Sequence, residues 1–201
     1  MIRFFKFISK SISMISPKLH THILYYIVFK KRLKLSKSSM QTLNEKIHWL
    51  KFNEYLGNDI YTKCADKYLV REYVISKGCG SILNPLIGVY NNFEEIRFSE
   101  LPSKFALKCN HGAGYNIIVE DKDKLDISVA RKKVNEWMRR DFSLSLSELH
   151  YKDIPRKIIC EEFLSNEDGR FPDDYKFYCF NGVPECVMLC QGRGDGQTKF
   201  Y

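Results

Sequence analysis

The residues with the clearest chemical potential lie in KFALKCNHGAGYNIIVED, residues 104–121. Lys108 ends one apolar run, and a loop with Gly112 and Gly114 separates it from a second apolar run. Backbone N–H groups of glycine-rich turns bind anions, and a neighbouring lysine adds a cation, so the stretch indicates a phosphate site. In strand alternation Ala106 and Lys108 share a face, which would point the cation into a cleft. The alternative is an edge-strand lysine that discourages aggregation.

Two common phosphate-binding motifs do not explain this loop. No G-x-x-x-x-G-K-[ST] string occurs, which excludes a Walker loop. A dinucleotide fingerprint needs a third glycine and then a helix, whereas Gly114 is followed by Asn116 and the β-branched run 117–119. The predicted order is therefore strand, glycine loop, strand. His111 is a candidate general base, but no partner for it can be placed, and we interpret it as a polar loop residue.

Two carboxylates end an apolar run in CEEFL, residues 160–164. Glu161 and Glu162 are consecutive in a predicted strand and therefore point to opposite faces. A strand that enters a hinge can offer its backbone to an adenine edge, while one carboxylate accepts a hydrogen bond from the exocyclic amine. The alternative is that one glutamate is solvated and the other pairs with a lysine.

A third polar pair occurs in DDYKFYCF, residues 173–180. Asp174 and Lys176 share one face of a predicted strand. They could bind a ribose hydroxyl and a phosphate, respectively. The alternative is an ion pair across the strand, worth only about 0.2–1 kcal/mol.

The elements that must position these residues alternate between helices and strands. Apolar spacing predicts helices over 40–55 and 59–78, and Asp126 can cap a helix that runs to about Arg140. The serine-rich stretch 141–153 is expected to be a loop. An edge strand over 82–90 is expected before the glycine loop, and three strand-like runs, 157–164, 174–180 and 183–190, follow it as one antiparallel group. The last two are joined by Asn181-Gly182, a strong hairpin signal.

The net charge of +8 is unevenly placed along the 201 residues. Residues 1–40 carry nine basic side chains and no acidic one, so the rest of the chain is nearly neutral. A nucleic-acid partner is therefore not expected for the folded body. The longest apolar run of this segment, 23–29, is far shorter than a membrane span needs, and no signal-peptide cleavage pattern follows. Basic residues among phenylalanine and isoleucine suit a helix on an anionic membrane surface, and packing on the body is the alternative.

Seven cysteines, with no C-x-x-C string, favour free thiols in a reducing cytoplasm. Four of them lie among apolar neighbours and are predicted to be buried: Cys64, Cys109, Cys160 and Cys179. We expect a cytoplasmic protein, and residues 1–40 would allow a peripheral position on the inner face of the membrane.

The order of these features resembles the ATP-grasp fold. The amino-acid sequence of the motifs resembles the TupA-like ATP-grasp family of bacterial cell-surface polysaccharide synthesis. The resemblance extends over roughly residues 40–201. The matching pieces are DKYLVREYV (66–74), LPSKFALKCNHGAGYNIIVED (101–121), PRKIICEEFL (155–164) and DYKFYCFNG (174–182). KCNHGAGYN followed by DYKFYCFNG is the most specific of them.

The resemblance implies an α+β, ATP-grasp-like fold with two α+β lobes and a nucleotide cleft between them, after a basic helical N-terminal segment. The expected regions are 1–40 (the basic amphipathic segment), 41–154 (the first lobe with the glycine loop) and 155–201 (the start of the second lobe). ATP and Mg²⁺ are the implied cofactors. The acids after Phe180 are Glu185 and Asp195, so we assign no metal ligand and expect the metal-binding strands beyond Tyr201.

The resemblance also implies a role for each site residue. Lys108 would contact the nucleotide phosphates, with Lys67 as a second cation, and His111 to Asn116, with Gly112 and Gly114, would be a mobile loop over them. The adenine side would use the Glu161 carboxylate for the amine, the backbone at Glu162 and Leu164, and Phe163 packed nearby. Asp174 would take the ribose, and Lys176 would face the transferring phosphate or the acceptor as the candidate catalytic residue.

The implied reaction is an ATP-dependent ligation in which a carboxylate is phosphorylated and an amine or thiol displaces the phosphate, with a carboxylate or glycan acceptor. A glycosyltransferase of the same pathway is one alternative. It would usually carry a D-x-D motif, and the only such spacing is Asp121-Lys122-Asp123. The other alternative is a non-catalytic remnant that binds nucleotide without turnover.

Overall fold

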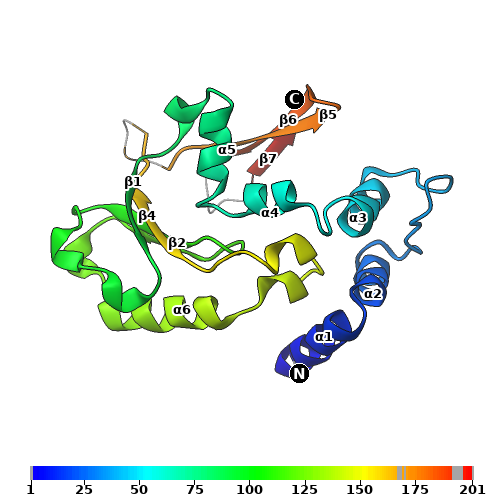
Figure 1. Cartoon of the computed structure of the whole chain (residues 1–201), viewed down its shortest axis with the longest axis horizontal. Coiled ribbons are helices and arrows are strands. Elements are labelled where there is room, and N and C mark those ends of the chain that lie inside the picture. Colours follow the sequence, from blue (N-terminus) through cyan, green and yellow to red (C-terminus); the bar gives the residue numbers. More distant parts are fainter. Residues whose placement is uncertain (1, 167–168, 170, 192–196, 201) are drawn as a thin grey trace. The chain divides into compact units, whose positions relative to one another are not determined.

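The computed structural model describes residues 2–166, 169, 171–191 and 197–200, and it has a mixed α+β architecture with two antiparallel sheets (Figure 1). This confirms the predicted α+β class. The chain divides into two compact units, Met1–Glu162 and Phe163–Tyr201, each described by itself below.

The first unit is built on a four-stranded sheet in the order β1-β4-β2-β3. Its strands are β1 (Leu86–Tyr90), β2 (Phe105–Cys109), β3 (Asn116–Val119) and β4 (Ile158–Glu162), and each neighbouring pair is antiparallel. The predicted strand before the glycine loop is confirmed as β1, at an edge of the sheet. The glycine loop joins β2 to β3, as the sequence predicted.

Strand β4 corrects the predicted grouping of three late strands. It lies between β1 and β2 in the first sheet and does not pair with the two strands that follow it. The physical reason is its composition, because Ile158, Ile159 and Cys160 are all fully buried and a run that is apolar on both faces needs a central position.

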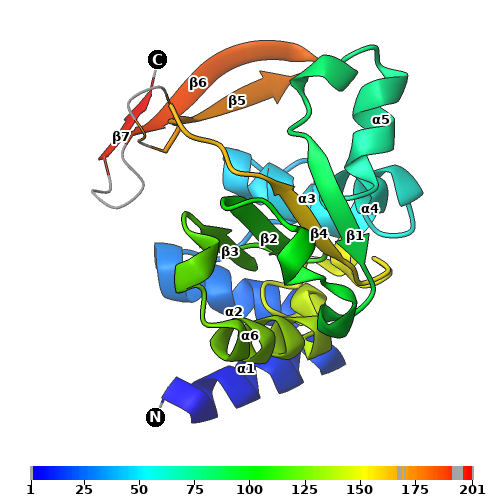
Figure 2. The ribbon, with the colours of Figure 1, turned by 90° about the vertical axis from the view of Figure 1, so that its left-hand side faces the viewer.

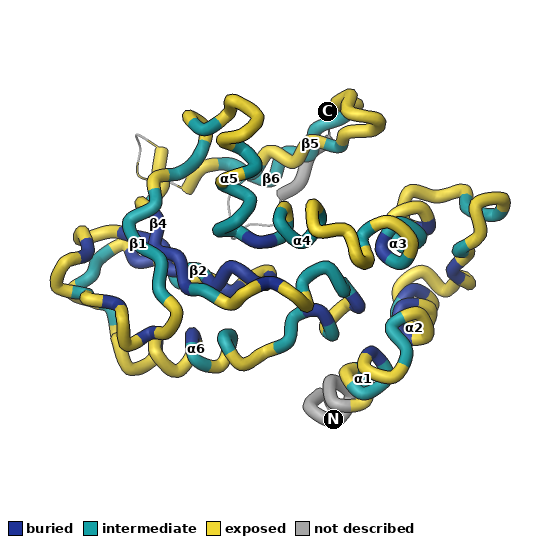
Figure 3. Tube along the Cα trace, in the orientation of Figure 1, coloured by how far each residue is buried: buried dark blue, intermediate teal, exposed yellow. Residues whose placement is uncertain are grey.

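The two faces of the sheet differ in chemistry. Phe105, Leu107 and Cys109 of β2 belong to the hydrophobic core, together with Ala130 and Val134 of helix α6 (Ile127–Arg139). Figure 2 shows α6 lying across this face of the sheet, and Figure 3 shows the buried centre of β2 and β4. The opposite face carries the alternate residues of β2 and β4, and the polar site described below lies there.

Helix α6 begins where the sequence predicted. The Asp126 carboxylate accepts a hydrogen bond from the backbone N–H of Val129 at 3.0 Å, which satisfies one free donor of the first turn. The predicted loop after it contains two short 3-10 helices. The 3-10 helices of the described chain are η1 (Gly80–Ile82), η2 (Phe93–Glu95), η3 (Phe98–Glu100), η4 (Lys122–Lys124), η5 (Phe142–Leu144) and η6 (Leu149–Tyr151).

The helix predicted over 59–78 is instead two helices, α4 (Asp59–Ala65) and α5 (Val70–Ser76). The Asp66 carboxylate accepts hydrogen bonds from the backbone N–H groups of Tyr68 and Leu69, at 2.8 and 3.2 Å. Such local bonds compete with helical ones, so the chain turns here. The helix predicted over 40–55 is confirmed as α3 (Leu43–Asn53), capped by Thr42.

Two further helices form the N-terminal segment, α1 (Ile2–Ile15) and α2 (Pro17–Phe29). Ser16 caps α2, and Pro17 occupies its first turn, where a missing N–H costs nothing. Among the described residues, none of the helices is both apolar enough and long enough to traverse a bilayer.

The second unit is a three-stranded antiparallel sheet, β5-β6-β7. Its strands are β5 (Asp174–Phe180), β6 (Val183–Gln191) and β7 (Gln197–Phe200). The predicted hairpin between β5 and β6 is confirmed, and both turn residues have positive φ, 53° at Asn181 and 82° at Gly182.

The cysteine prediction is half right. Cys109 and Cys160 are buried free thiols, whereas Cys64 and Cys179 are exposed. Cys64 ends a short surface helix, and Cys179 lies on a thin sheet with few core neighbours, so apolar sequence neighbours did not imply burial. Burial raises the pKa of both Cys109 and Cys160 to about 12, so these thiols stay protonated.

Candidate functional site

The site is centred on an ion pair across β2 and β4. Ala106 lies directly opposite Glu161 in the strand register, and Lys108 is two residues further along the same face. Because Ala106 is small, the lysine reaches diagonally to the carboxylate, and Lys108 Nζ lies 2.5 Å from Glu161 Oε2. The Glu161 side chain is only 9% exposed, so this is a largely desolvated carboxylate.

Two more cations from the α5 region approach the same point. Arg71 Nη1 lies 3.4 Å from Glu161 Oε1, and the Arg71 side chain is 16% exposed. Lys67 donates a hydrogen bond to the Gly112 carbonyl of the glycine loop. Burial lowers the pKa of Lys67, and the charge of the neighbouring Lys108 lowers it further. The two lysines predicted from the sequence are therefore brought together.

These side chains line an open pocket of about 230 Å³. Its charged walls are Lys67, Arg71, Lys108 and Glu161, which leaves an excess of positive charge. Its other walls are Val70, Ile82, Leu83 and Asn84. A pocket lined by both cations and aliphatic groups suits a ligand with an anionic end and a flat apolar end.

The beginning of the glycine loop is anchored inside the first unit. Asn110 is fully buried, and its side-chain amide donates to the Asp66 carboxylate and to the Pro155 carbonyl, both at 2.9 Å. Its side-chain oxygen accepts from the backbone N–H of Lys157 at 2.8 Å. This network connects the glycine loop to the turn that carries Lys67, so the same hydrogen bonds hold both the loop and Lys67 in position.

His111 is buried and does not line the pocket. Its ring is 2% exposed, and Nε2 lies 3.1 Å from the Trp137 carbonyl, which requires a proton on Nε2. Burial lowers the pKa of His111, in agreement with a neutral ring. Its imidazole therefore does not reach the pocket, and a role as general base has no geometric support.

The two loop glycines meet different demands. A Cβ at Gly112 would lie 2.7 Å from Tyr115 and 2.9 Å from Phe142, so packing requires glycine there. Gly114 has φ of +72° with open space around it, so glycine is favoured there by the left-handed backbone conformation and not by packing. Gly114 and Asn116 are exposed, and they are the parts of the loop that a ligand can reach.

The backbone at Glu162, predicted to recognise adenine, is already engaged. Its N–H donates to the Pro85 carbonyl at 3.1 Å, and its carbonyl accepts from the Asn84 side chain at 2.9 Å. A carbonyl oxygen can accept two hydrogen bonds, so the Glu162 carbonyl can still accept one from a ligand. The Glu162 side chain is exposed, on the opposite face from Glu161, as predicted.

The remaining predicted residues belong to the second unit. Lys176 Nζ lies 3.4 Å from Asp174 Oδ2 and 3.3 Å from Cys190 Sγ. The hydrogen bond to Cys190 and the charge of Asp174 raise the pKa of Lys176, so it is a cation at neutral pH. Phe163 packs 5.9 Å from Phe171, measured between ring centroids, and Leu164 is 54% exposed.

Sequence reasoning missed three site residues. Arg71 is four residues after Lys67, a spacing that brings side chains together on helical turns, so the signal was present in the sequence. Asp66 and Asn110 are 1% and 0% exposed, and no pattern in the sequence predicts that these two polar residues are buried.

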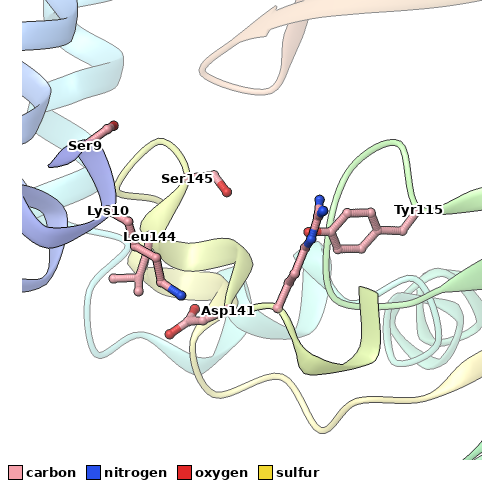
Figure 4. A pocket seen from close by; sticks show the side chains of 7 residues that line it. Ser9, Lys10, Tyr115, Asp141, Leu144 and Ser145 are labelled. Carbon is pink, nitrogen blue, oxygen red and sulfur yellow. The ribbon is translucent and has the colours of Figure 1, made fainter. Parts of the chain in front are cut away.

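A second pocket, of about 370 Å³, adjoins Tyr115 of the glycine loop (Figure 4). Lys10, Asp141 and Ser145 are among its other lining residues, and Figure 4 shows them across the opening from Tyr115. Tyr115 belongs to the loop predicted to cover the phosphates, but the predicted lysines, glutamates and aspartate do not line this pocket, so we place the candidate site at the first pocket.

No group of three or more acidic, histidine or cysteine side chains that could hold a metal ion occurs among residues 2–166, 169, 171–191 and 197–200. The described residues therefore do not by themselves fit a Mg²⁺ ion, and we derive no step through one.

The comparisons with known proteins identify one family. The model described as TupA-like ATPgrasp matches residues 45–201, more than three quarters of the chain, and this stretch contains every predicted nucleotide contact. No curated protein and no solved structure matches the chain significantly.

Proposed function

The chain belongs to the TupA-like ATP-grasp family, and from this premise we propose that it binds ATP at the pocket lined by Lys67, Arg71 and Lys108. The observation that carries the proposal is the gathering of these three cations in one pocket beside a glycine loop, where Lys108 and Arg71 contact Glu161 and Lys67 contacts the loop. Three cations against one carboxylate leave a positive excess that suits phosphate groups.

The pocket offers different surroundings to the two ends of the nucleotide. Val70, Ile82 and Leu83 provide an aliphatic wall against which a purine can lie. Glu161 uses one carboxylate oxygen for Lys108 and the other for Arg71, and each oxygen retains a lone pair. The carboxylate can therefore accept a further hydrogen bond from the adenine amine.

The cations are divided between the phosphates in this proposal. Lys108 is in direct contact with Glu161, so it serves the phosphate nearest the nucleoside. Lys67 is bonded to the glycine loop, so it serves the outer phosphates together with the exposed backbone at Gly114. The lowered pKa of Lys67 makes it the cation that gains most from an anionic ligand.

The reaction that we propose is a ligation of the ATP-grasp type in cell-surface polysaccharide synthesis, with a carboxylate or glycan acceptor. Asp174 and Lys176 retain the roles that the resemblance implies for them, the ribose and the transferring phosphate. Lys176 carries a raised pKa, which keeps it charged for that role.

Calorimetric titration with a non-hydrolysable ATP analogue tests the nucleotide assignment, with UDP-glucose and GTP as competitors and with Mg²⁺ present or absent. Binding of the adenine nucleotide in preference to both competitors supports the proposal. A preference for UDP-glucose would favour a glycosyltransferase instead, and no binding of any nucleotide would contradict the assigned pocket.

A further inference from the structure

Helix α2 has one covered side and, opposite it, an apolar side that is not covered. His20, Thr21 and Tyr25 are 1%, 2% and 6% exposed, and they form its inner side. The opposite side, which we call the outer face, consists of Leu19, Ile23, Tyr26 and Ile27, with 53%, 37%, 58% and 45% exposure. Figure 3 shows buried and exposed residues alternating along this helix. An exposed apolar side of a helix with a polar rim is typical of an interaction surface.

The outer face cannot turn inward, because buried hydrogen bonds hold the inner side. His20 Nδ1 lies 2.8 Å from Ser147 Oγ, and His20 Nε2 lies 2.7 Å from Ser9 Oγ. Ser147 is fully buried and also lies 3.1 Å from Ser13 Oγ. This cluster joins α1, α2 and the segment before η6, so rotation of α2 would leave several buried polar groups without partners.

Positive charge lies immediately beside the outer face. Lys30 ends α2 in the left-handed conformation, and Lys31 and Arg32 follow it, all three exposed. We call these three residues the basic cluster. Residues 1–40 contain no acidic side chain that could neutralise them.

We propose that the outer face and the basic cluster together bind the surface of a lipid bilayer that contains anionic headgroups. The helix would lie in the plane of the interface, with its aliphatic and aromatic side chains among the acyl chains and its lysines and arginine at the phosphates. Tyr26 suits this depth, since its ring is apolar and its hydroxyl is polar.

The charge distribution favours a lipid surface over two other partners. A second copy of the chain, docked through the same face in a symmetric dimer, would offer no acidic side chain from its residues 1–40 to the basic cluster. A nucleic acid would satisfy the cations but would leave the apolar side chains of the outer face uncovered. The membrane inference does not depend on ATP binding, because none of its residues lines the proposed nucleotide pocket.

Flotation of the full chain with lipid vesicles tests this inference. One preparation contains phosphatidylcholine, and the other contains equal parts of phosphatidylcholine and phosphatidylglycerol. We expect the protein to float with the anionic vesicles and to stay behind with the neutral ones. Added salt should weaken the association, because the Debye length shortens.

Two paired variants separate charge from apolar contact. Lys31→Glu/Arg32→Glu should weaken binding to the anionic vesicles at least about twentyfold, because each basic residue near such a surface contributes roughly a factor of five. Ile23→Gln/Ile27→Gln should weaken it at least about tenfold, because two buried side chains are lost. The matched controls are Lys132→Glu/Lys133→Glu and Ile127→Gln/Val129→Gln, which change exposed residues of α6.

Full binding by the two α6 controls and weak binding by the two α2 variants support the proposal. Equal loss in variants and controls would overturn it, as would the absence of binding to anionic vesicles. Concentration-dependent dimerisation that is abolished by Ile23→Gln/Ile27→Gln would also overturn it, because the outer face would then be a protein interface.

Discussion

The Lys108 ammonium and the Glu161 carboxylate are in direct contact across β2 and β4, with 2.5 Å between Nζ and Oε2. The contact lies on the sheet face opposite helix α6. Glu161 thus compensates cations that would otherwise repel each other in a partly desolvated pocket. A bound polyphosphate would neutralise the positive charge of the same cations, as the Glu161 carboxylate does.

Lys108→Ala should weaken binding of the ATP analogue about tenfold to a hundredfold, because it removes one charge-assisted contact to a phosphate. Arg71 remains as a partner for Glu161, so the fold should persist. Calorimetric titration measures the affinity, and circular dichroism checks the fold. The control is Lys132→Ala on the exposed side of α6, which should bind like the parent. Parent-like affinity in Lys108→Ala would contradict the site assignment.

Glu161→Gln should relax the preference for adenine over guanine. The carboxylate accepts from the adenine amine and repels the guanine carbonyl, whereas an amide can donate to that carbonyl. Loss of the two ion pairs should also lower the free energy of unfolding by about 1–3 kcal/mol. Affinities for the ATP and GTP analogues give the ratio, and urea denaturation gives the stability. If both affinities are measurable and their ratio is unchanged, Glu161 does not contact the adenine ring.

Local features of the fold were predictable, and long-range pairings were not. The Asn181-Gly182 turn and the Asp126 cap each depend on a few adjacent residues, and both were predicted correctly. Lys108 and Glu161 were each predicted as site residues, but their contact depends on β4 pairing with β2 across more than fifty residues of chain. The apolar run Ile158-Ile159-Cys160, which suits a strand buried on both faces, was the available signal for that pairing.

The two loop glycines should respond differently to substitution. Gly112→Ala is expected to lower the free energy of unfolding by about 1–3 kcal/mol, because the new methyl group would overlap the rings of Tyr115 and Phe142. Gly114→Asn should cost less than about 1 kcal/mol, because asparagine tolerates the left-handed conformation and the surrounding space is open. Urea unfolding of both variants beside the parent provides the comparison. A larger loss for Gly114→Asn would show that the loop packs differently from this structure.

Stability should fall as the pH is lowered from 6.5 towards 4. Burial, followed by the nearby charges of Lys51 and His22, lowers the pKa of His48 from 6.5 to about 4. Between these values the unfolded chain binds a proton that the folded chain does not, so protonation favours unfolding. Burial lowers the pKa of His20 and His150 in the same direction.

The His48 contribution can be isolated with a matched pair of variants. His48→Gln should reduce the loss of stability over this pH range by an amount on the order of 1 kcal/mol. Asn44→Gln, at an exposed position of the same helix α3, should leave the pH dependence close to that of the parent, because it removes no titratable group. Urea unfolding at several pH values across the range measures both slopes. If His48→Gln retained the full slope of the parent, the half-buried ring at His48 would not be the group that resists protonation.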